Sequence, residues 1–99
     1  MNDSVGMVEV TGSSNAIYVL DTMLKAAAVR LLSWETIFGI GRVTVFIEGD
    51  VAAVNAAVEA ARQNHMCNIF ASYVIATPYQ ETRRFLDRSA KKHGIKKSY

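Results

Sequence analysis

The fold is decided by a short glycine-rich stretch between two β-type segments, Ile37-Phe38-Gly39-Ile40-Gly41. The segment before it, 29–36, and the segment after it, 42–48, both read as strands, so a tight turn is predicted between them. Glycine permits positive φ angles and close approach of the backbone to a neighbour. A buried core gives no reason for a large apolar residue such as Ile40 in this turn. We therefore expect the turn to support something just outside the subunit.

The first half of the chain reads as a β-α-β unit. Residues 5–10 predict a short strand, and the polar run 11–15 supplies turn and N-cap chemistry for the helix that follows. The apolar residues of this helix at helical spacing, which we expect to face the core, are Ile17, Leu20, Leu24 and Ala27. Asp21 and Lys25 form an i,i+4 charge pair on another face. The unit then returns as the strand 29–36.

The second half repeats this plan. Apolar residues alternate with others in 42–48, which indicates a half-buried strand. Gly49-Asp50 then precedes an alanine-rich helix, in which alanine favours helix formation and close packing. The apolar stripe of this helix is Val51, Val54, Val58 and Ala61. Residues 69–75 alternate again before Pro78. The predicted fold class is α+β, a split β-α-β (ferredoxin-like) sheet with two helices on one face.

The composition predicts self-association. The chain has 99 residues, enough for one domain, and 51% of them are hydrophobic. A domain of this size buries only roughly 60–65% of its extended-chain surface, so apolar side chains are left over for a partner. The single cysteine, Cys67, excludes an intrachain disulfide. No charged start leads into an apolar run, and no apolar stretch approaches the length of a membrane span. We therefore expect a cytoplasmic protein without membrane contact.

The charges are distributed unevenly along the chain. Residues 1–79 carry four basic and seven acidic side chains, a net charge of −3, whereas 80–99 carry seven basic and two acidic ones, a net charge of +5. A basic end of this kind can contact nucleic acid, acidic partners or anionic membranes. More often such an end is solvated and partly mobile, and we favour that interpretation.

Residue patterns for catalysis and cofactor binding are missing from the sequence. There is no Ser/His/Asp set and no paired carboxylates, and Gly39-Ile40-Gly41 lacks the further glycine or Lys-Ser/Thr of nucleotide loops. Cys67 could be redox-active or hold an iron–sulfur cluster in an assembly, but a half-buried structural thiol is favoured because no second ligand lies near it. His65 is expected to face solvent, and Trp34 is expected in the core or an interface. We predict no enzyme activity, no cofactor and no metal.

Four motifs occur in an order that resembles a known family. They are Gly6-Met7-Val8-Glu9, Asp21-Thr22-Met23-Leu24-Lys25-Ala26-Ala27, Gly39-Ile40-Gly41 and Glu48-Gly49-Asp50-Val51-Ala52-Ala53. Together they resemble the single-domain, hexamer-forming shell proteins of bacterial microcompartments, which have the BMC fold. The resemblance covers about residues 4–79. We expect a BMC shell domain over 1–86 that ends in a short C-terminal helix or basic tail. The basic tail over 87–99 lies outside the resemblance.

The resemblance implies a structural role and particular site residues. Members of the family form flat hexamers that tile edge to edge into a shell around enzymes in the bacterial cytoplasm. The central pore for small metabolites would be lined by Phe38, Gly39, Ile40 and Gly41. Contacts at the hexamer edge would come from Lys25, Thr77, Pro78 and Tyr79. The implied partners are five further copies of the chain, other shell proteins and, as candidates, the encapsulated enzymes.

The chain departs from the family pattern in three places. The pore loop usually reads Lys-Ile-Gly-Ser-Gly, but here no lysine precedes it, Ile40 replaces the serine, and one extra residue stands at or near Phe38. The second edge motif, Pro-Arg-Pro-His, becomes Ala76-Thr77-Pro78-Tyr79. Threonine cannot reproduce the directed hydrogen bonds of arginine, so weaker edges are expected. The third departure is the basic tail.

Two other classes of function remain open on the residues alone. A ferredoxin-like regulatory domain would use the same β-α-β pair to bind a small effector between subunits. A nucleic-acid binder would use the basic tail, but the strands lack the aromatic-rich pattern of RNA-binding sheets. Nucleic acid is therefore the least favoured partner.

Overall fold

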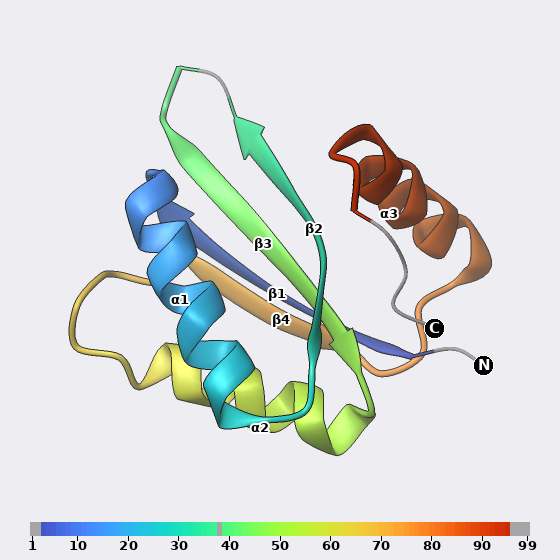
Figure 1. Ribbon diagram of the computed structural model, residues 1–99, viewed down its shortest axis with the longest axis horizontal. Coiled ribbons are helices and arrows are strands. Elements are labelled where there is room, and N and C mark those ends of the chain that lie inside the picture. The colour runs from blue at the N-terminus through green and yellow to red at the C-terminus, as the bar shows by residue number, and fades with distance from the viewer. Residues whose placement is uncertain (1–2, 38, 96–99) are drawn as a thin grey trace.

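The computed structural model describes residues 3–37 and 39–95, which form seven elements around one sheet (Figure 1). In chain order these are β1 (Ser4–Thr11), α1 (Ser13–Ala26), β2 (Arg30–Ile37), β3 (Arg42–Gly49), α2 (Val51–Arg62), β4 (Ala71–Ile75) and α3 (Gln80–Lys92). The strands lie in the order β2-β3-β1-β4, and each neighbouring pair is antiparallel. β1 and β2 are therefore parallel with β3 between them. This is the split β-α-β arrangement, and the predicted α+β fold class is confirmed.

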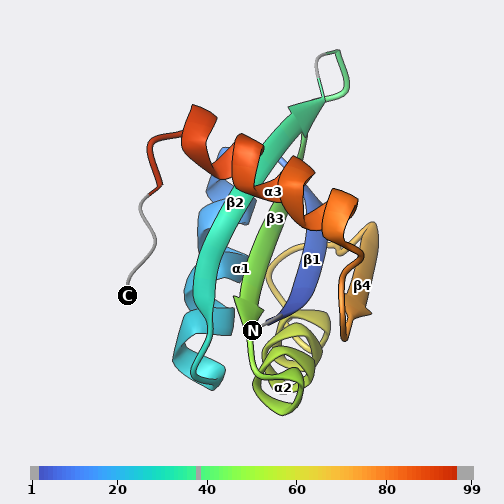
Figure 2. The ribbon, with the colours of Figure 1, turned by 90° about the vertical axis from the view of Figure 1, so that its right-hand side faces the viewer.

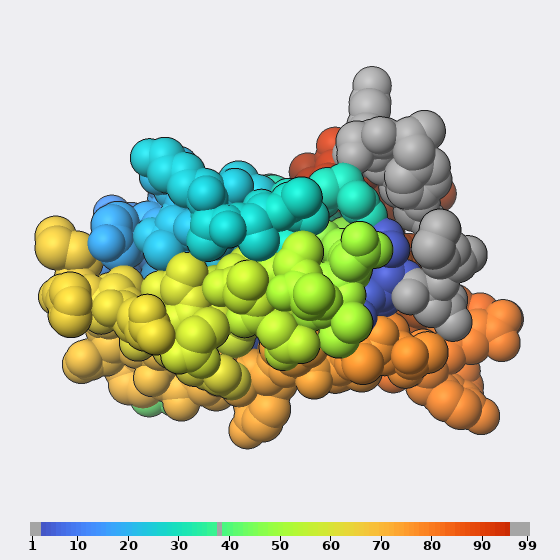
Figure 3. All heavy atoms as spheres, turned by 90° about the horizontal axis from the view of Figure 1, so that it is seen from below, coloured from blue at the N-terminus to red at the C-terminus, as the bar shows by residue number. Residues whose placement is uncertain are grey.

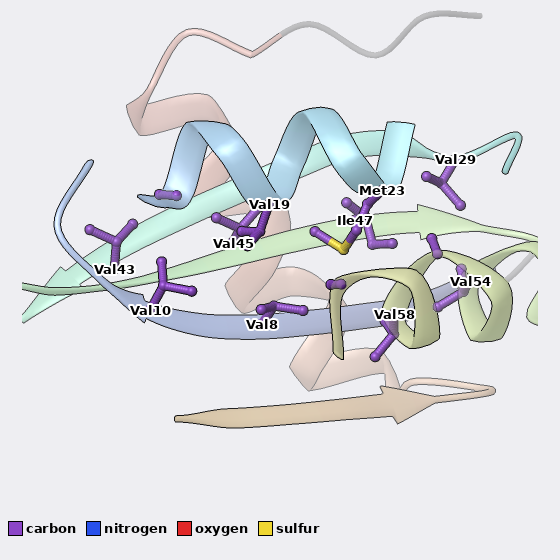
Figure 4. Packing of buried hydrophobic residues seen from close by; sticks show 13 residues of the cluster. Val8, Val10, Val19, Met23, Val29, Val43, Val45, Ile47, Val54 and Val58 are labelled. Atoms are coloured by element: carbon purple, nitrogen blue, oxygen red, sulfur yellow. The ribbon is translucent and has the colours of Figure 1, made fainter. Parts of the chain in front are cut away.

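The main core lies between the sheet and the pair of helices α1 and α2, which cover the same face as predicted (Figure 4). Val8 and Val45 of the sheet point toward the helices, where they meet Val19 of α1 and Val58 of α2. All four side chains are 3% exposed or less. Apolar burial of this kind is the dominant force that holds the two layers together.

α2 approaches the sheet very closely at one glycine. A Cβ atom on Gly6 of β1 would lie 2.8 Å from Val58 Cγ2 and 2.9 Å from Val54 Cγ1. The alanine residues that face the sheet, Ala57 and Ala61, are fully buried. The predicted packing role of the alanines is thus confirmed for these two, whereas Ala52 and Ala56 are exposed. Val51, expected in the same stripe, begins the helix and is 46% exposed.

The buried face of α1 differs from the prediction. The residues that α1 buries are Ala16, Val19 and Met23. Of the predicted residues, Leu20 and Ala27 pack at the margin of the core, whereas Ile17 is 67% exposed and Leu24 is 42% exposed. Two apolar stripes overlap on this helix, offset by one residue or about 100°. The stripe with small Ala16 allows the helix to lie close to the sheet, and the other stripe stays on the surface of the single chain.

The second face of the sheet is covered in part by α3, which crosses it on the side opposite α1 (Figure 2). Leu86 of α3 is 2% exposed and packs with Leu32 and Phe46. As a result the second half of β3 is buried on both faces, and Phe46 and Glu48 are only 8% and 5% exposed, whereas Arg42 and Thr44 in its first half are half-buried. The predicted alternation of burial is confirmed over 42–45 and was wrong over 46–48, because the pattern along one strand cannot indicate that a helix from the end of the chain covers its other face.

α3 continues through the expected boundary after Leu86. Ser89 and Ala90, which lie beyond that boundary, are buried, so we propose that the packed unit extends through α3. The basic tail expected over 87–99 is therefore a packed helix as far as Lys92. Residues 96–99 of that tail lie outside the described residues, as does Phe38 of the expected pore loop.

An ion-pair cluster holds the N-terminal end of α3. The carboxylate of Glu48, at the end of β3, accepts a hydrogen bond from Arg83 of α3 and lies 3.8 Å from Nε of Arg30. Arg30 also donates to Asp3 at 2.5 Å. Burial by itself would lower the pKa of Arg83, but Glu48, with help from Asp87, outweighs this and leaves that pKa raised. Removal of one partner from a buried pair typically costs about 3–5 kcal/mol, so this cluster fixes α3 on the sheet.

Candidate functional site

The glycine turn between β2 and β3 carries an exposed apolar side chain. Gly39 and Gly41 both have positive φ, 92° and 68°, and the carbonyl of Gly41 accepts a 2.7 Å hydrogen bond from the backbone N–H of Gly12. Only glycine adopts such backbone angles without strain. Ile40 between the two glycines is 57% exposed. The turn is therefore anchored at its base and presents Ile40 away from the core of the subunit.

The predicted edge residues differ in what they can offer to a neighbour. Lys25 is exposed on α1, and its Nζ lies 2.8 Å from Oδ2 of Asp21, as the i,i+4 spacing predicted. The hydrogen bond and the charge of Asp21 raise the pKa of Lys25, and its amine carries a positive charge at neutral pH, as it would without this shift. Thr77 and Tyr79 are exposed, with Tyr79 at 74%, but Pro78 between them is buried. Pro78 thus shapes this corner and offers little surface of its own.

The glycine turn and the edge residues lie at opposite ends of the sheet (Figure 1). The turn connects Ile37 of β2 to Arg42 of β3, which form the last pair of the two strands at this end. At the other end Arg30, the first residue of β2, pairs with Glu48, and Thr77 lies two residues beyond the end of β4. β3 spans eight residues between these ends, which is about 23 Å at ~3.3 Å per residue. Figure 3 shows the side of the molecule on which α2 and the C-terminal end of α1 lie.

An apolar groove, which the sequence did not predict, opens between α1 and the β2 side of the sheet. Its volume is about 370 Å³. Its lining residues are Ser13, Ala16, Ile17, Leu20, Leu31, Trp34, Thr36, Val43 and Val45. The polar groups among these side chains are the hydroxyls of Ser13 and Thr36 and the indole N–H of Trp34. The signal in the sequence was the second apolar stripe of α1, which was assigned to the core of the subunit.

α3 supports one wall of this groove. The ring of Trp34 stacks on His93, just after α3, with ring centroids 4.0 Å apart. The next residue, Glu35, accepts hydrogen bonds from Ser89 and from Lys92 at 3.3 Å. The hydrogen bond from Ser89 is the main cause that lowers the pKa of Glu35; burial opposes it and Lys92 adds to it. The C-terminal end of α3 therefore fixes Trp34 from outside the groove.

The remaining candidate residues have structural positions. Cys67 is half-buried and packs against the main core, and His65 is exposed, as both favoured interpretations predicted. Within residues 3–37 and 39–95, no group of three or more His, Cys, Asp or Glu side chains could hold a metal ion. No helix in this described part of the chain is long and apolar enough to cross a membrane.

Comparison with known proteins identifies the family. A family model described as the BMC domain matches residues 4–78. The chain belongs to the BMC domain family. The carboxysome shell protein CcmK2 of Synechocystis sp. is 39% identical over 84 residues, which cover 81% of this chain and 81% of that protein. The microcompartment shell protein PduA of Salmonella typhimurium is 39% identical over 88 residues, covering 87% of this chain and 93% of that protein.

A solved structure shares the fold of this BMC domain. The crystal structure of a microcompartment protein from Desulfitobacterium hafniense DCB superposes with a TM-score of 0.75 and 29% sequence identity. The match covers 90% of this chain and 49% of the other, so the chain spans about half the length of that protein. The resemblance drawn from the four motifs is thereby confirmed, together with the BMC fold. A structural role in the shell of a bacterial microcompartment follows from membership of this family.

Proposed function

We propose that six copies of this BMC domain form a closed ring around the glycine turn, and that such rings tile into the facets of a microcompartment shell. The observation that carries the proposal is the exposed Ile40 between two glycines with positive φ, at one end of the sheet. The residues matched to the edge contacts of the family, Lys25 and Thr77, lie at the other end. A turn at the axis and an edge at the rim require such a separation.

The pore of this ring would be apolar at its tip. Six copies of Ile40 around one axis form a hydrophobic collar, and a narrow apolar constriction disfavours ions and can empty of water. Gly39 and Gly41 bring the backbone to the axis. Arg42, which follows Gly41, would not line the pore, because its guanidinium is held over the ring of Phe70, 4.0 Å from the centroid. The pore is therefore suited to small uncharged metabolites.

The rim of the ring would contact other tiles through the positively charged Lys25 and the exposed Thr77 and Tyr79. Other shell proteins of the same compartment are the partners that this rim fits, and encapsulated enzymes are candidates for either face of the disc. Such a tile performs no reaction, so we infer that the protein is not an enzyme. With a threonine where an arginine is usual, rings are expected to join weakly unless other tiles take part.

Native mass spectrometry at micromolar concentration tests the ring. Six copies of 10.9 kDa give about 65 kDa, and a closed cyclic assembly should show this mass without a ladder of intermediates. A monomer or a dimer would refute the proposal. Electron microscopy of the same sample then tests tiling, since sheets, tubes and single discs are directly distinguishable.

The apolar groove favours one other candidate function, a regulatory domain that binds a small apolar effector. In that case the effector would occupy the 370 Å³ groove between α1 and β2, and binding would change the fluorescence of Trp34. A dimer whose melting temperature rises with an added apolar compound would support this function. A ring of about 65 kDa that does not respond to such compounds would exclude it.

A further inference from the structure

We propose that the apolar groove of each subunit is filled by a segment of the next subunit in the ring, residues 64–70, here called the plug. This inference rests on the proposed ring and assigns its contact surface. The plug connects α2 to β4 and carries two exposed apolar side chains, Met66 at 73% and Phe70 at 47% exposure.

The groove is a core that one chain leaves incomplete. Ile17 at its rim is 67% exposed, and its floor is formed by Val43 and Val45 of β3. An apolar cavity gives water few hydrogen-bonding partners; a cavity of about 150 Å³ with such a lining stays dry and accepts a benzene ring. A groove of about 370 Å³ therefore has room for roughly two large apolar side chains.

The plug is held in one shape before any contact forms. The side-chain oxygen of Asn64 accepts hydrogen bonds from the backbone N–H groups of Met66 and Cys67, both at 2.8 Å. The side-chain nitrogen of Asn64 donates to the carbonyl of Ala61 at 2.7 Å. At the far end of the plug, the backbone N–H of Phe70 donates to the backbone carbonyl of Glu9 at 2.9 Å. A preorganised segment loses little conformational entropy on binding. These hydrogen bonds therefore favour insertion of the exposed Met66 side chain into the groove of the next subunit.

Groove and plug lie on opposite sides of the same subunit. The groove opens beside β2, which is one edge of the sheet, and the plug leads into β4, which is the other edge. Contact between two different surfaces of identical subunits is heterologous. Repetition of such a contact generates a ring when the rotation from one subunit to the next returns to the first subunit. A groove in one copy and a plug in the next therefore give the head-to-tail contact that a ring requires.

The two surfaces also lie at compatible distances from the proposed axis. Thr36 and Val43 of the groove form the pair next to the glycine turn. Phe70 of the plug contacts Arg42, which directly follows the turn. A rotation about the axis keeps the distance from it unchanged, so touching surfaces must share a radius. Both surfaces extend from the same end of the sheet, as this condition demands.

Disulfide crosslinking tests the contact. In a Cys67→Ser background, which removes the single native cysteine, Ile17→Cys and Met66→Cys would be combined and oxidised at low protein concentration. We expect a ladder of covalent oligomers that ends at six subunits on a denaturing gel. Each single-cysteine variant should give no ladder, and neither should the control pair Val51→Cys with Met66→Cys, because Val51 is exposed at the remote end of the sheet.

The result separates the contact from the ring. A 65 kDa ring that yields no ladder from the Ile17/Met66 pair would overturn the assigned contact and leave the ring standing, whereas the absence of any ring would refute both. If the double variant does not fold, Met66→Lys gives the second test. It should raise the subunit concentration needed for ring assembly at least about tenfold, because a lysine ammonium is costly to bury in an apolar site. Val51→Lys should leave assembly unchanged, and equal effects of the two variants would overturn the contact.

Discussion

Replacement of Ile40 by serine separates a pore-lining residue from a core residue. Full burial of an isoleucine side chain is worth about 1.5–3 kcal/mol. Ile40 is 57% exposed in the subunit, so Ile40→Ser should lower the free energy of unfolding by about 1 kcal/mol at most. For a domain of this size such a loss lowers the melting temperature by no more than about 4–8 °C. The ring should remain intact, and a crystal structure should show a wider opening on its axis.

Ile47 provides the matched control for this substitution. It lies in the same hairpin but is 0% exposed, so Ile47→Ser should cost at least about 3 kcal/mol through the cavity and the buried hydroxyl. Both variants would be compared by thermal denaturation at one fixed subunit concentration. If Ile40→Ser is as destabilising as Ile47→Ser and the axis is unchanged, then Ile40 belongs to the core and the pore assignment has to be withdrawn.

Three further predictions concern the rim, the α2 contact and α3. Lys25→Asp should leave the ring intact but abolish extended sheets in electron micrographs, because it adds a carboxylate beside Asp21 where a neighbour meets an amine; sheets as abundant as in the wild type would show that the rim is assigned wrongly. Gly6→Ala should lower the free energy of unfolding in urea by about 1–3 kcal/mol, since the added Cβ has no room against α2; an unchanged midpoint would contradict this close approach. The folded-state pKa of Glu35 is lowered, chiefly by the hydrogen bond from Ser89, so the contact between Glu35 and α3 is fully present above the ordinary glutamate range and is lost as the pH falls through the lower folded-state pKa. Trp34 fluorescence should report this acid transition, and Glu35→Gln should remove it; identical curves for both proteins would count against this contact.

The turn and the element order could be predicted from local residues. Gly39 and Gly41 determine the backbone of the turn whatever surrounds them, because only glycine adopts their positive φ without strain. Alternation in 42–48 and helical spacing in 51–61 depend on near neighbours in the chain, and they placed β3 and α2 correctly. The pair of Asp21 and Lys25 is also local, and it formed as predicted.

The faces that each element buries could not be predicted in the same way. α1 has two apolar stripes, and only the fit to the sheet decides that Val19 is buried while Ile17 is exposed. The burial of Glu48 depends on Arg83, which is 35 residues away in the sequence. Which of these side chains are buried is decided by tertiary packing, which cannot be predicted from the periodicity of a single segment. The groove was missed for the same reason, because its walls come from three separate elements.

The ring would explain why α1 carries a second apolar stripe that is exposed in the single chain: part of this stripe would be buried against the next subunit. Hydrophobic patterning does not distinguish a core within one chain from a core shared by two chains. In a closed ring each subunit contributes one groove and one plug and therefore takes part in two contacts. Removal of one subunit breaks both, so a contact of modest strength suffices to hold the ring. A substitution such as Met66→Lys then weakens both contacts of every subunit, one through its own plug and one through the plug of its neighbour. Met66 can therefore decide assembly although its side chain is 73% exposed in the single chain.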